Sequence, residues 1–122
     1  MILVDTSIWI DHLRSGNQRL SRLLERSQVL AHPWVIGELA LGNLHRRGEI
    51  LRLLRGLPQA TVATDVEVMA LIDQQALYGS GIGYVDAQLL AATRLSGDAR
   101  LWTIDARLAS PATLLGVADQ AD

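Results

Sequence analysis

The chain opens with Met1-Ile2-Leu3-Val4-Asp5-Thr6-Ser7, an apolar run that ends on an acidic residue and two hydroxyl side chains. A short run of consecutive apolar residues predicts a strand that is buried on both faces, as in a parallel sheet covered by helices. Thr6 or Ser7 can then cap a following helix. A second junction of the same kind occurs at Leu101-Trp102-Thr103-Ile104-Asp105. Both segments predict strands of one α/β fold, each followed by an aspartate.

The rest of the chain alternates between predicted strands and predicted helices. This alternation, with apolar rather than alternating strands, predicts a three-layer α/β/α sandwich around a parallel sheet of four to five strands. We expect residues 1–122 to form a single domain. The predicted strands are 2–5, 29–32, 60–63, 100–104 and a weak one at 117–118. Helices are predicted after residue 6, around 20–24, from 33 to about 41, at 48–57, from 64 to about 78, at 84–95 and from 105 onward.

Composition excludes several classes of protein. The chain contains no Cys, which rules out a disulfide framework, a thiol nucleophile and a Cys-based zinc site. Its apolar stretches are too short to span a bilayer, so we expect a soluble, cytoplasmic protein with no membrane association. The formal net charge of −2 argues against a protein built mainly to coat nucleic acid.

All of the basic side chains apart from histidine are arginines. The absence of Lys excludes a P-loop nucleotide-binding site, which needs a phosphate-binding Lys. It also disfavours phospho-receiver domains and haloacid-dehalogenase-like phosphatases, since both rely on a Lys to bind the phosphoryl group. Two arginine clusters remain open to two interpretations, a solvated helix surface or contact with phosphate. These clusters are Arg19, Arg22 and Arg26, and Arg46, Arg47, Arg52 and Arg55.

Four carboxylates, Asp5, Glu38, Asp86 and Asp105, interrupt strongly apolar segments. A buried ionised carboxylate costs several kcal/mol unless a cation pairs with it, so four of them indicate a shared cationic partner. Asp5 and Asp105 follow predicted strands, and ligands of α/β sheets bind at the carboxyl ends of strands. Taken singly, either aspartate could instead cap a helix.

Glu38 and Asp86 lie inside apolar helical patterns. At about 100° per residue, Glu38 shares a face with Trp34, Val35 and Leu41, so we expect its side chain to point with the core. Asp86 likewise shares a face with apolar residues of its own helix. Asp86 also falls in the first helical turn, where the helix dipole favours an anion.

Four oxygen ligands without Cys suit a hard cation, Mg²⁺ or Mn²⁺, rather than zinc. Such an ion could activate a water molecule and stabilise the leaving oxygen in phosphodiester hydrolysis. The glycine-rich loop at residues 79–83 could approach a phosphate, although a plain turn is the better explanation. The three histidines lack metal-binding spacing, and we expect each at the surface or at its boundary. They are His12, His32 and His45.

Four segments, in order and spacing, resemble the PIN-domain nucleases, in particular the VapC-type toxins of toxin–antitoxin systems. The opening Met1-Ile-Leu-Val-Asp5-Thr6-Ser7 is similar to the start of that family. Val35-Ile-Gly-Glu38-Leu resembles the family's helical Glu segment. Tyr84-Val-Asp86-Ala-Gln-Leu-Leu-Ala-Ala-Thr93 and Leu101-Trp-Thr103-Ile-Asp105 resemble the third and fourth acidic segments. The resemblance extends over nearly the whole chain.

The resemblance implies a five-stranded parallel sheet and a Mg²⁺- or Mn²⁺-dependent endoribonuclease. It implies that the four acids hold the metal, and our mechanistic hypothesis makes Asp5 and Asp86 its main anchors. Family members act on structured RNA such as tRNA or rRNA, form homodimers and are inhibited by a VapB-like antitoxin in the prokaryotic cytoplasm. The implied catalytic and metal-binding residues are Asp5, Glu38, Asp86 and Asp105, with Thr6, Ser7 and Thr103 in supporting or substrate-binding roles.

Two alternatives stay open at this point. One is a non-catalytic PIN-like module that binds RNA or protein, for which a missing acidic position would be the sign; all four are present. The other is a non-toxin PIN nuclease in RNA processing, or one that acts on DNA. The short chain, without an appended RNA-binding domain, favours the toxin.

Overall fold

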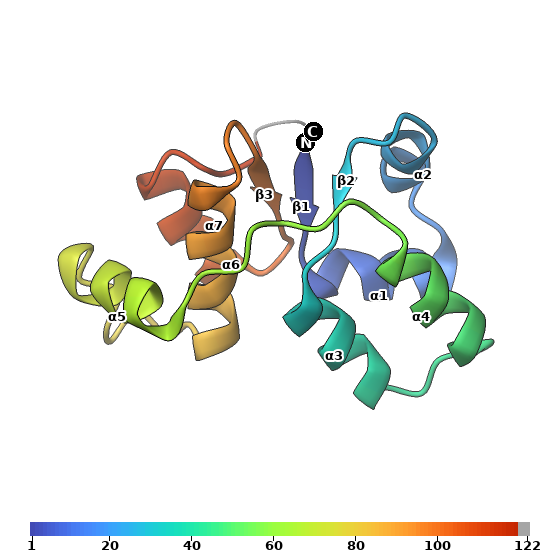
Figure 1. The fold of residues 1–122 in the computed structure, drawn as a ribbon, viewed down its shortest axis with the longest axis horizontal. Coiled ribbons are helices and arrows are strands. Elements are labelled where there is room, and N and C mark those ends of the chain that lie inside the picture. The colour runs from blue at the N-terminus through green and yellow to red at the C-terminus, as the bar shows by residue number, and fades with distance from the viewer. Residues whose placement is uncertain (120–122) are drawn as a thin grey trace.

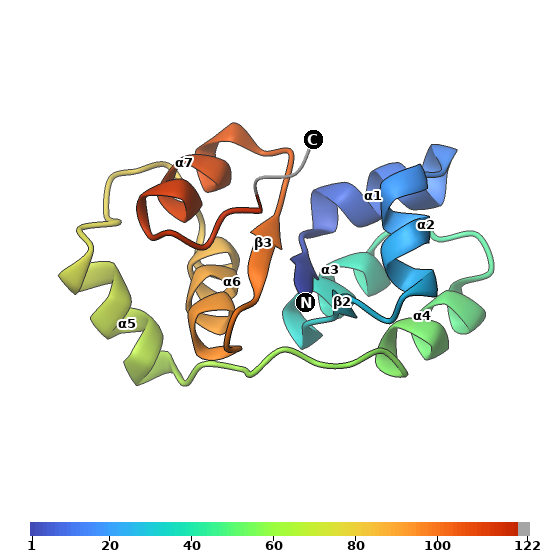
Figure 2. The same ribbon diagram turned by 90° about the horizontal axis from the view of Figure 1, so that it is seen from above.

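The computed structural model describes residues 1–119, which form a parallel sheet with helices on both sides (Figure 1 and Figure 2). The strands are β1 (Ile2–Val4), β2 (Val29–Leu30) and β3 (Arg100–Trp102), in the order β2-β1-β3. The helices are α1 (Thr6–Ser15), α2 (Gln18–Glu25), α3 (Pro33–Leu41), α4 (Arg47–Arg55), α5 (Asp65–Gln74), α6 (Tyr84–Leu95) and α7 (Ala106–Leu114).

β1 is the central strand, and both of its faces are covered. It pairs in parallel with β2 and with β3. Leu3 and Val4 are each 0% exposed, although successive side chains of a strand point to opposite faces. The apolar opening of the chain therefore correctly predicted a doubly covered parallel strand, and the predicted α/β class is confirmed.

The predicted number of strands was too high, because residues 60–63 do not form a strand. In this part of the chain only Gln59 pairs with the sheet, through a single bridge to Ala31. The N–H of Ala60 completes this bridge by donating to the carbonyl of Ala31 at 2.8 Å. The neighbouring segment then begins α3 at Pro33, so residues 60–63 have no further strand to pair with.

The edge of the sheet beside β3 also lacks the strand that was predicted there. The weak strand predicted at 117–118 is reduced to one bridge, between Ala118 and Leu101 in β3. Residues 1–119 therefore contain three strands with a single bridge at each edge, rather than four to five strands. Several element ends also differ from the predictions: β3 ends at Trp102, α5 ends at Gln74, and α4 spans Arg47–Arg55.

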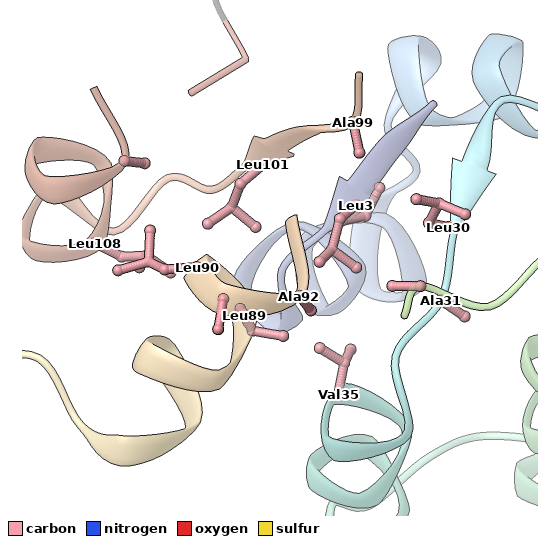
Figure 3. Close-up of a cluster of buried hydrophobic side chains, with 14 of the residues drawn as sticks. Leu3, Leu30, Ala31, Val35, Leu89, Leu90, Ala92, Ala99, Leu101 and Leu108 are labelled. Atoms are coloured by element: carbon pink, nitrogen blue, oxygen red, sulfur yellow. The ribbon is translucent and has the colours of Figure 1, made fainter. Parts of the chain in front are cut away.

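The core extends over the sheet and the helices around it, and one part of it lies between the sheet and α6 (Figure 3). Leu3 and Leu101 of the sheet, Leu89 and Leu90 of α6 and Leu108 of α7 are all 2% exposed or less. Complete burial of one such side chain contributes about 1.5–3 kcal/mol. Every position of α6 from Ala87 to Thr93 is buried, so packing holds this helix in place. Asp86 lies directly before this buried stretch and is positioned by it.

α3 begins beside a histidine that is 0% exposed, so the predicted surface or boundary position of His32 was wrong. Its Nδ1 accepts a 3.0 Å hydrogen bond from the backbone N–H of Trp34 and caps the helix. Since Nδ1 accepts, the neutral ring carries its proton on Nε2, which is buried without a partner among the described residues. Desolvation by burial lowers the pKa of His32 to about 4.

One member of the first arginine cluster has a structural role. Arg19 makes a bidentate pair with Asp119, with distances of 2.5 and 3.1 Å. Its guanidinium also lies 4.4 Å from the ring centroid of Trp102. Arg19 therefore joins α2 to β3 and to the segment that follows α7. Among the helices of residues 1–119, none is both long and apolar enough to cross a membrane.

Candidate active site

Asp5 lies between the end of β1 and the start of α1. Its side chain makes no capping hydrogen bond to α1, so the capping interpretation of this residue was wrong. Instead Oδ2 accepts hydrogen bonds from Ser7 at 2.8 Å and from Thr103 at 2.7 Å. The residue is only 6% exposed, and Oδ1 accepts no hydrogen bond from residues 1–119. One oxygen is fixed by two hydroxyls and the other stays available.

Asp105 lies after β3, beside Asp5. The backbone N–H of Asp5 donates to the carbonyl of Trp102, which joins the ends of β1 and β3. Thr103 links the two acids, because its hydroxyl donates to Asp5 and accepts the backbone N–H of Asp105 at 3.0 Å. Oδ1 of Asp105 caps α7 by accepting the N–H of Arg107 at 2.9 Å. The capping role is real here, but it occupies one carboxylate oxygen of two.

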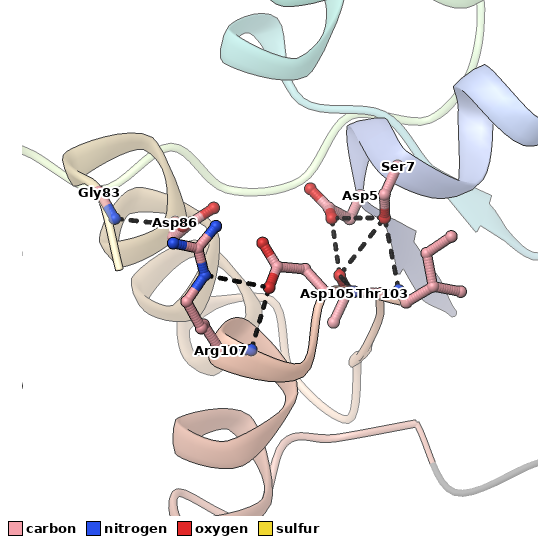
Figure 4. Close-up of polar contacts among 8 residues, drawn as sticks. Asp5, Ser7, Gly83, Asp86, Thr103, Asp105 and Arg107 are labelled. Atoms are coloured by element: carbon pink, nitrogen blue, oxygen red, sulfur yellow. Dashed lines mark hydrogen bonds and ion pairs between the residues drawn. The ribbon is translucent and has the colours of Figure 1, made fainter. Parts of the chain in front are cut away.

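Asp86 approaches the same place from the first turn of α6 (Figure 4). Its Oδ2 accepts the N–H of Gly83 at 3.2 Å. Desolvation by burial raises the pKa of Asp86, and the charges of Asp5 and Asp105 raise it further, while Gly83 and Arg107 act in the opposite direction. Mutual repulsion of this kind requires the carboxylates to lie within electrostatic range of each other. Figure 4 shows Asp105 between Asp5 and Asp86.

Glu38 lies on α3 and is linked to the neighbour of Asp5, but it does not face the core as predicted. Its side chain is exposed, as are Trp34 and Leu41 on the same face, whereas Val35 and Leu39 are buried. The expectation that Glu38 points toward the core was wrong. Because α3 has apolar residues on nearly all sides, its sequence pattern does not show which side is buried. Oε1 of Glu38 accepts a 2.5 Å hydrogen bond from Thr6, the neighbour of Asp5.

The four carboxylates share one arrangement. In each, one oxygen accepts a hydrogen bond from the protein and the other accepts none from residues 1–119. As the side chains stand, no three His, Cys, Asp or Glu within those residues form a group that could hold a metal ion. The oxygen-only donor set suits a hard cation such as Mg²⁺ or Mn²⁺, and the free oxygens are the ones that could turn onto it.

Sequence reasoning missed two features near the acids. Arg107 places its Nε 3.6 Å from Oδ1 of Asp105. A cation in the first turn of a helix opposes the helix dipole, and this mismatch was the signal that could have identified it. The second feature is an aromatic pair: the rings of Trp34 and Tyr84 lie 5.6 Å apart and connect the helices that carry Glu38 and Asp86.

Comparison with known proteins matches residues 2–114 to the PIN domain. The chain belongs to the PIN-domain family. This PIN domain is 49% identical over 118 residues to the protein named Ribonuclease VapC32 from two strains of Mycobacterium tuberculosis. The match covers 97% of this chain and 95% of each relative. The predicted resemblance to VapC-type PIN domains is confirmed, and all four acids fall inside the matched residues.

Proposed function

We propose that this PIN-domain protein is a metal-dependent endoribonuclease and the toxin of a VapB/VapC-like toxin–antitoxin pair. The observation that carries the proposal is the set of four carboxylates, each with one oxygen fixed and one free. The 49% identity to a protein named as a ribonuclease supports RNA as the substrate. The whole chain acts as one nuclease domain in the cytoplasm of a prokaryote.

Each acid has a defined part in this proposal. Asp5 and Asp86 anchor Mg²⁺ or Mn²⁺, Glu38 binds it directly or through water, and Asp105 completes the ligand shell or a second-ion site. When bound, the ion supplies a water of lowered pKa and offsets the negative charge that develops on the phosphate.

The hydroxyl side chains orient the acids rather than react. Ser7 and Thr103 both donate to Oδ2 of Asp5, which leaves Oδ1 without a hydrogen bond from residues 1–119. Thr6 holds Glu38 in the same way. Partners of this kind fix the orientation and basicity of ligands, and their loss commonly costs 10–100-fold in metal affinity or activity.

We also propose the partners that the resemblance implies: RNA of the tRNA or rRNA class, a second copy of the chain and a VapB-like antitoxin. A cleft of about 410 Å³ lies between α1 and α3. It supports the proposal of an antitoxin partner, because its lining includes the apolar residues Ile10, Leu13 and Leu44 and reaches Glu38. An apolar segment seated there would extend toward the acids. Ile8 and Trp9 are core residues instead, each under 5% exposed.

Cleavage of a pooled structured-RNA substrate, with Mg²⁺ or Mn²⁺ and then with EDTA, tests the proposed activity. The wild type, Asp86→Asn and the control Asp73→Asn are compared. Asn keeps the acceptor for the N–H of Gly83, while Asp73 is an exposed acid on α5 outside the group. We expect metal-dependent cleavage by the wild type and the control, and none by Asp86→Asn.

Other outcomes decide between the alternatives. Cleavage that survives EDTA or the Asp86 substitution would reject the site. Cleavage of DNA equal to that of RNA would favour a different nuclease. Folded, antitoxin-free protein that binds RNA but never cuts it would favour the non-catalytic binding module.

A further inference from the structure

Arg107 is the cation that the structure places against the acidic group. Its guanidinium extends beside Asp86 in Figure 4, and its Nε lies 3.6 Å from Oδ1 of Asp105. The charge of Arg107 also lowers the pKa of Asp86, in opposition to Asp5 and Asp105. Arg107 therefore pairs with the carboxylate of Asp105 and lies within electrostatic range of Asp86 on α6.

Arg107 contacts Asp105 twice, weakly through its guanidinium and more closely through its backbone N–H. The Arg107 side chain is 71% exposed, and at 3.6 Å its ion pair lacks a tight hydrogen bond. The cap of α7 depends on the backbone N–H of Arg107, which donates to Asp105 at 2.9 Å. The guanidinium can therefore leave the carboxylate without loss of the helix cap.

The glycine loop before α6 lies against this side chain. A Cβ built on Gly81 would contact Cδ of Arg107 at 3.5 Å, and Gly81 has a φ of +90°, which favours glycine. The loop that leads to Asp86 thus packs beside the aliphatic part of Arg107. It keeps the guanidinium next to the acids while leaving it exposed to solvent.

We propose that Arg107 is the phosphate-binding residue of this site, paired with the acids in the free protein and transferred to a backbone phosphate of the substrate when RNA binds. This inference rests on the proposed nuclease function. Arginine suits the role, because its fork of donors matches the oxygens of a phosphate as well as those of a carboxylate. After the transfer the guanidinium still has an anionic partner, and the carboxylates that it leaves are free to pair with the metal ion.

Two measurements on Arg107→Gln test the proposal. In the free protein, loss of a cation beside the carboxylates should raise the affinity for Mn²⁺ by about 3- to 10-fold. For RNA, Asp86→Asn and Asp86→Asn/Arg107→Gln are compared by filter binding of the RNA pool, so that cleavage does not interfere. The double variant should bind several-fold more weakly, and the slope of log affinity against log salt should fall by roughly one.

Arg46→Gln is the matched control. Arg46 is also 71% exposed and loosely paired, with Nη1 3.7 Å from Glu49, but it lies next to α4 on the other side of the molecule from α7 (Figure 1). Both substitutions change the net charge equally. The inference is overturned if Arg107→Gln behaves like Arg46→Gln in both measurements while the wild type still cuts RNA. Failure of the nuclease itself is a different result: the wild type would then cut no RNA.

Discussion

The hydroxyl of Thr6 donates a 2.5 Å hydrogen bond to Oε1 of Glu38, which joins the first turn of α1 to the exposed face of α3. Thr6 directly follows Asp5, the acid at the end of the central strand. An exposed glutamate is thereby held by the residue that follows the buried end of the central strand. The bond links Glu38 to the neighbour of Asp5 even though the face of α3 that carries Glu38 is open to solvent.

Replacement of Thr6 by Val should release Glu38 while keeping the size of the side chain. Because the bond is exposed, we expect little change in the free energy of unfolding, but metal-dependent cleavage should fall by about 10-fold or more. Thr113→Val is the control, since its hydroxyl donates to Ala109 within α7, away from Glu38. Equal activities for the two variants would remove Thr6 from the site. Chemical denaturation and RNA cleavage provide the two readouts.

Ser7 and Thr103 both donate to the same oxygen of Asp5, so they should substitute for each other in part. Ser7→Ala or Thr103→Val alone should each cost about 1 kcal/mol in unfolding free energy or less. The double variant should lose more activity than the two single effects predict, because it frees Asp5 completely. A double-mutant cycle on cleavage rate measures this coupling. Strict additivity would contradict a shared role.

Asp86→Asn should stabilise the metal-free protein while it abolishes cleavage. The raised pKa of Asp86 means that folding disfavours its ionised form, so this group lowers stability as pH rises above its ordinary value of 3.8. The gain in Tm should be small at pH 7, since Asp86 is only half-buried and solvent screens its charge, and it should vanish at low pH. Thermal unfolding in EDTA at several pH values tests this. A lower Tm for the variant at pH 7 would contradict it.

His32 should make the fold sensitive to acid. The unfolded chain binds a proton on this ring below about pH 6.5, whereas the folded protein does so only at about pH 4. Stability should therefore fall as pH drops through this window, by up to about 3 kcal/mol. His32→Asn keeps a strong capping residue but does not titrate there. Urea unfolding from pH 7 to pH 4 should show a shallower loss for the variant; equal slopes would assign the loss to other groups.

The sequence predicted well wherever one signal dominates. The apolar run at Leu3 and Val4 predicted a strand buried on both faces, and the helix predicted from residue 64 begins with a capping box formed by Thr64 and Glu67. Both depend on residues that are close in the chain. The order and spacing of the acids along the chain carry the family resemblance.

Features that depend on distant neighbours were not predictable. α3 is apolar on most sides, so periodicity could not tell that Glu38 faces solvent. Residues 60–63 resemble a strand in sequence, but the chain beside them begins α3 at Pro33, so they have no strand to pair with beyond the bridge between Ala31 and Gln59. His32 is buried by packing that no local pattern records. The position of Arg107 beside Asp86 likewise arises only when α7 meets α6.

The most direct measurement is Mn²⁺ affinity, by titration calorimetry, for the wild type and four isosteric variants. These variants are Asp5→Asn, Glu38→Gln, Asp86→Asn and Asp105→Asn. If the four carboxylates turn their free oxygens onto one site, each substitution should weaken Mn²⁺ binding by about 10-fold or more, while Asp73→Asn leaves it unchanged. Wild-type affinity in Glu38→Gln or Asp105→Asn would exclude that acid, and wild-type affinity in Asp5→Asn or Asp86→Asn would contradict the metal site itself.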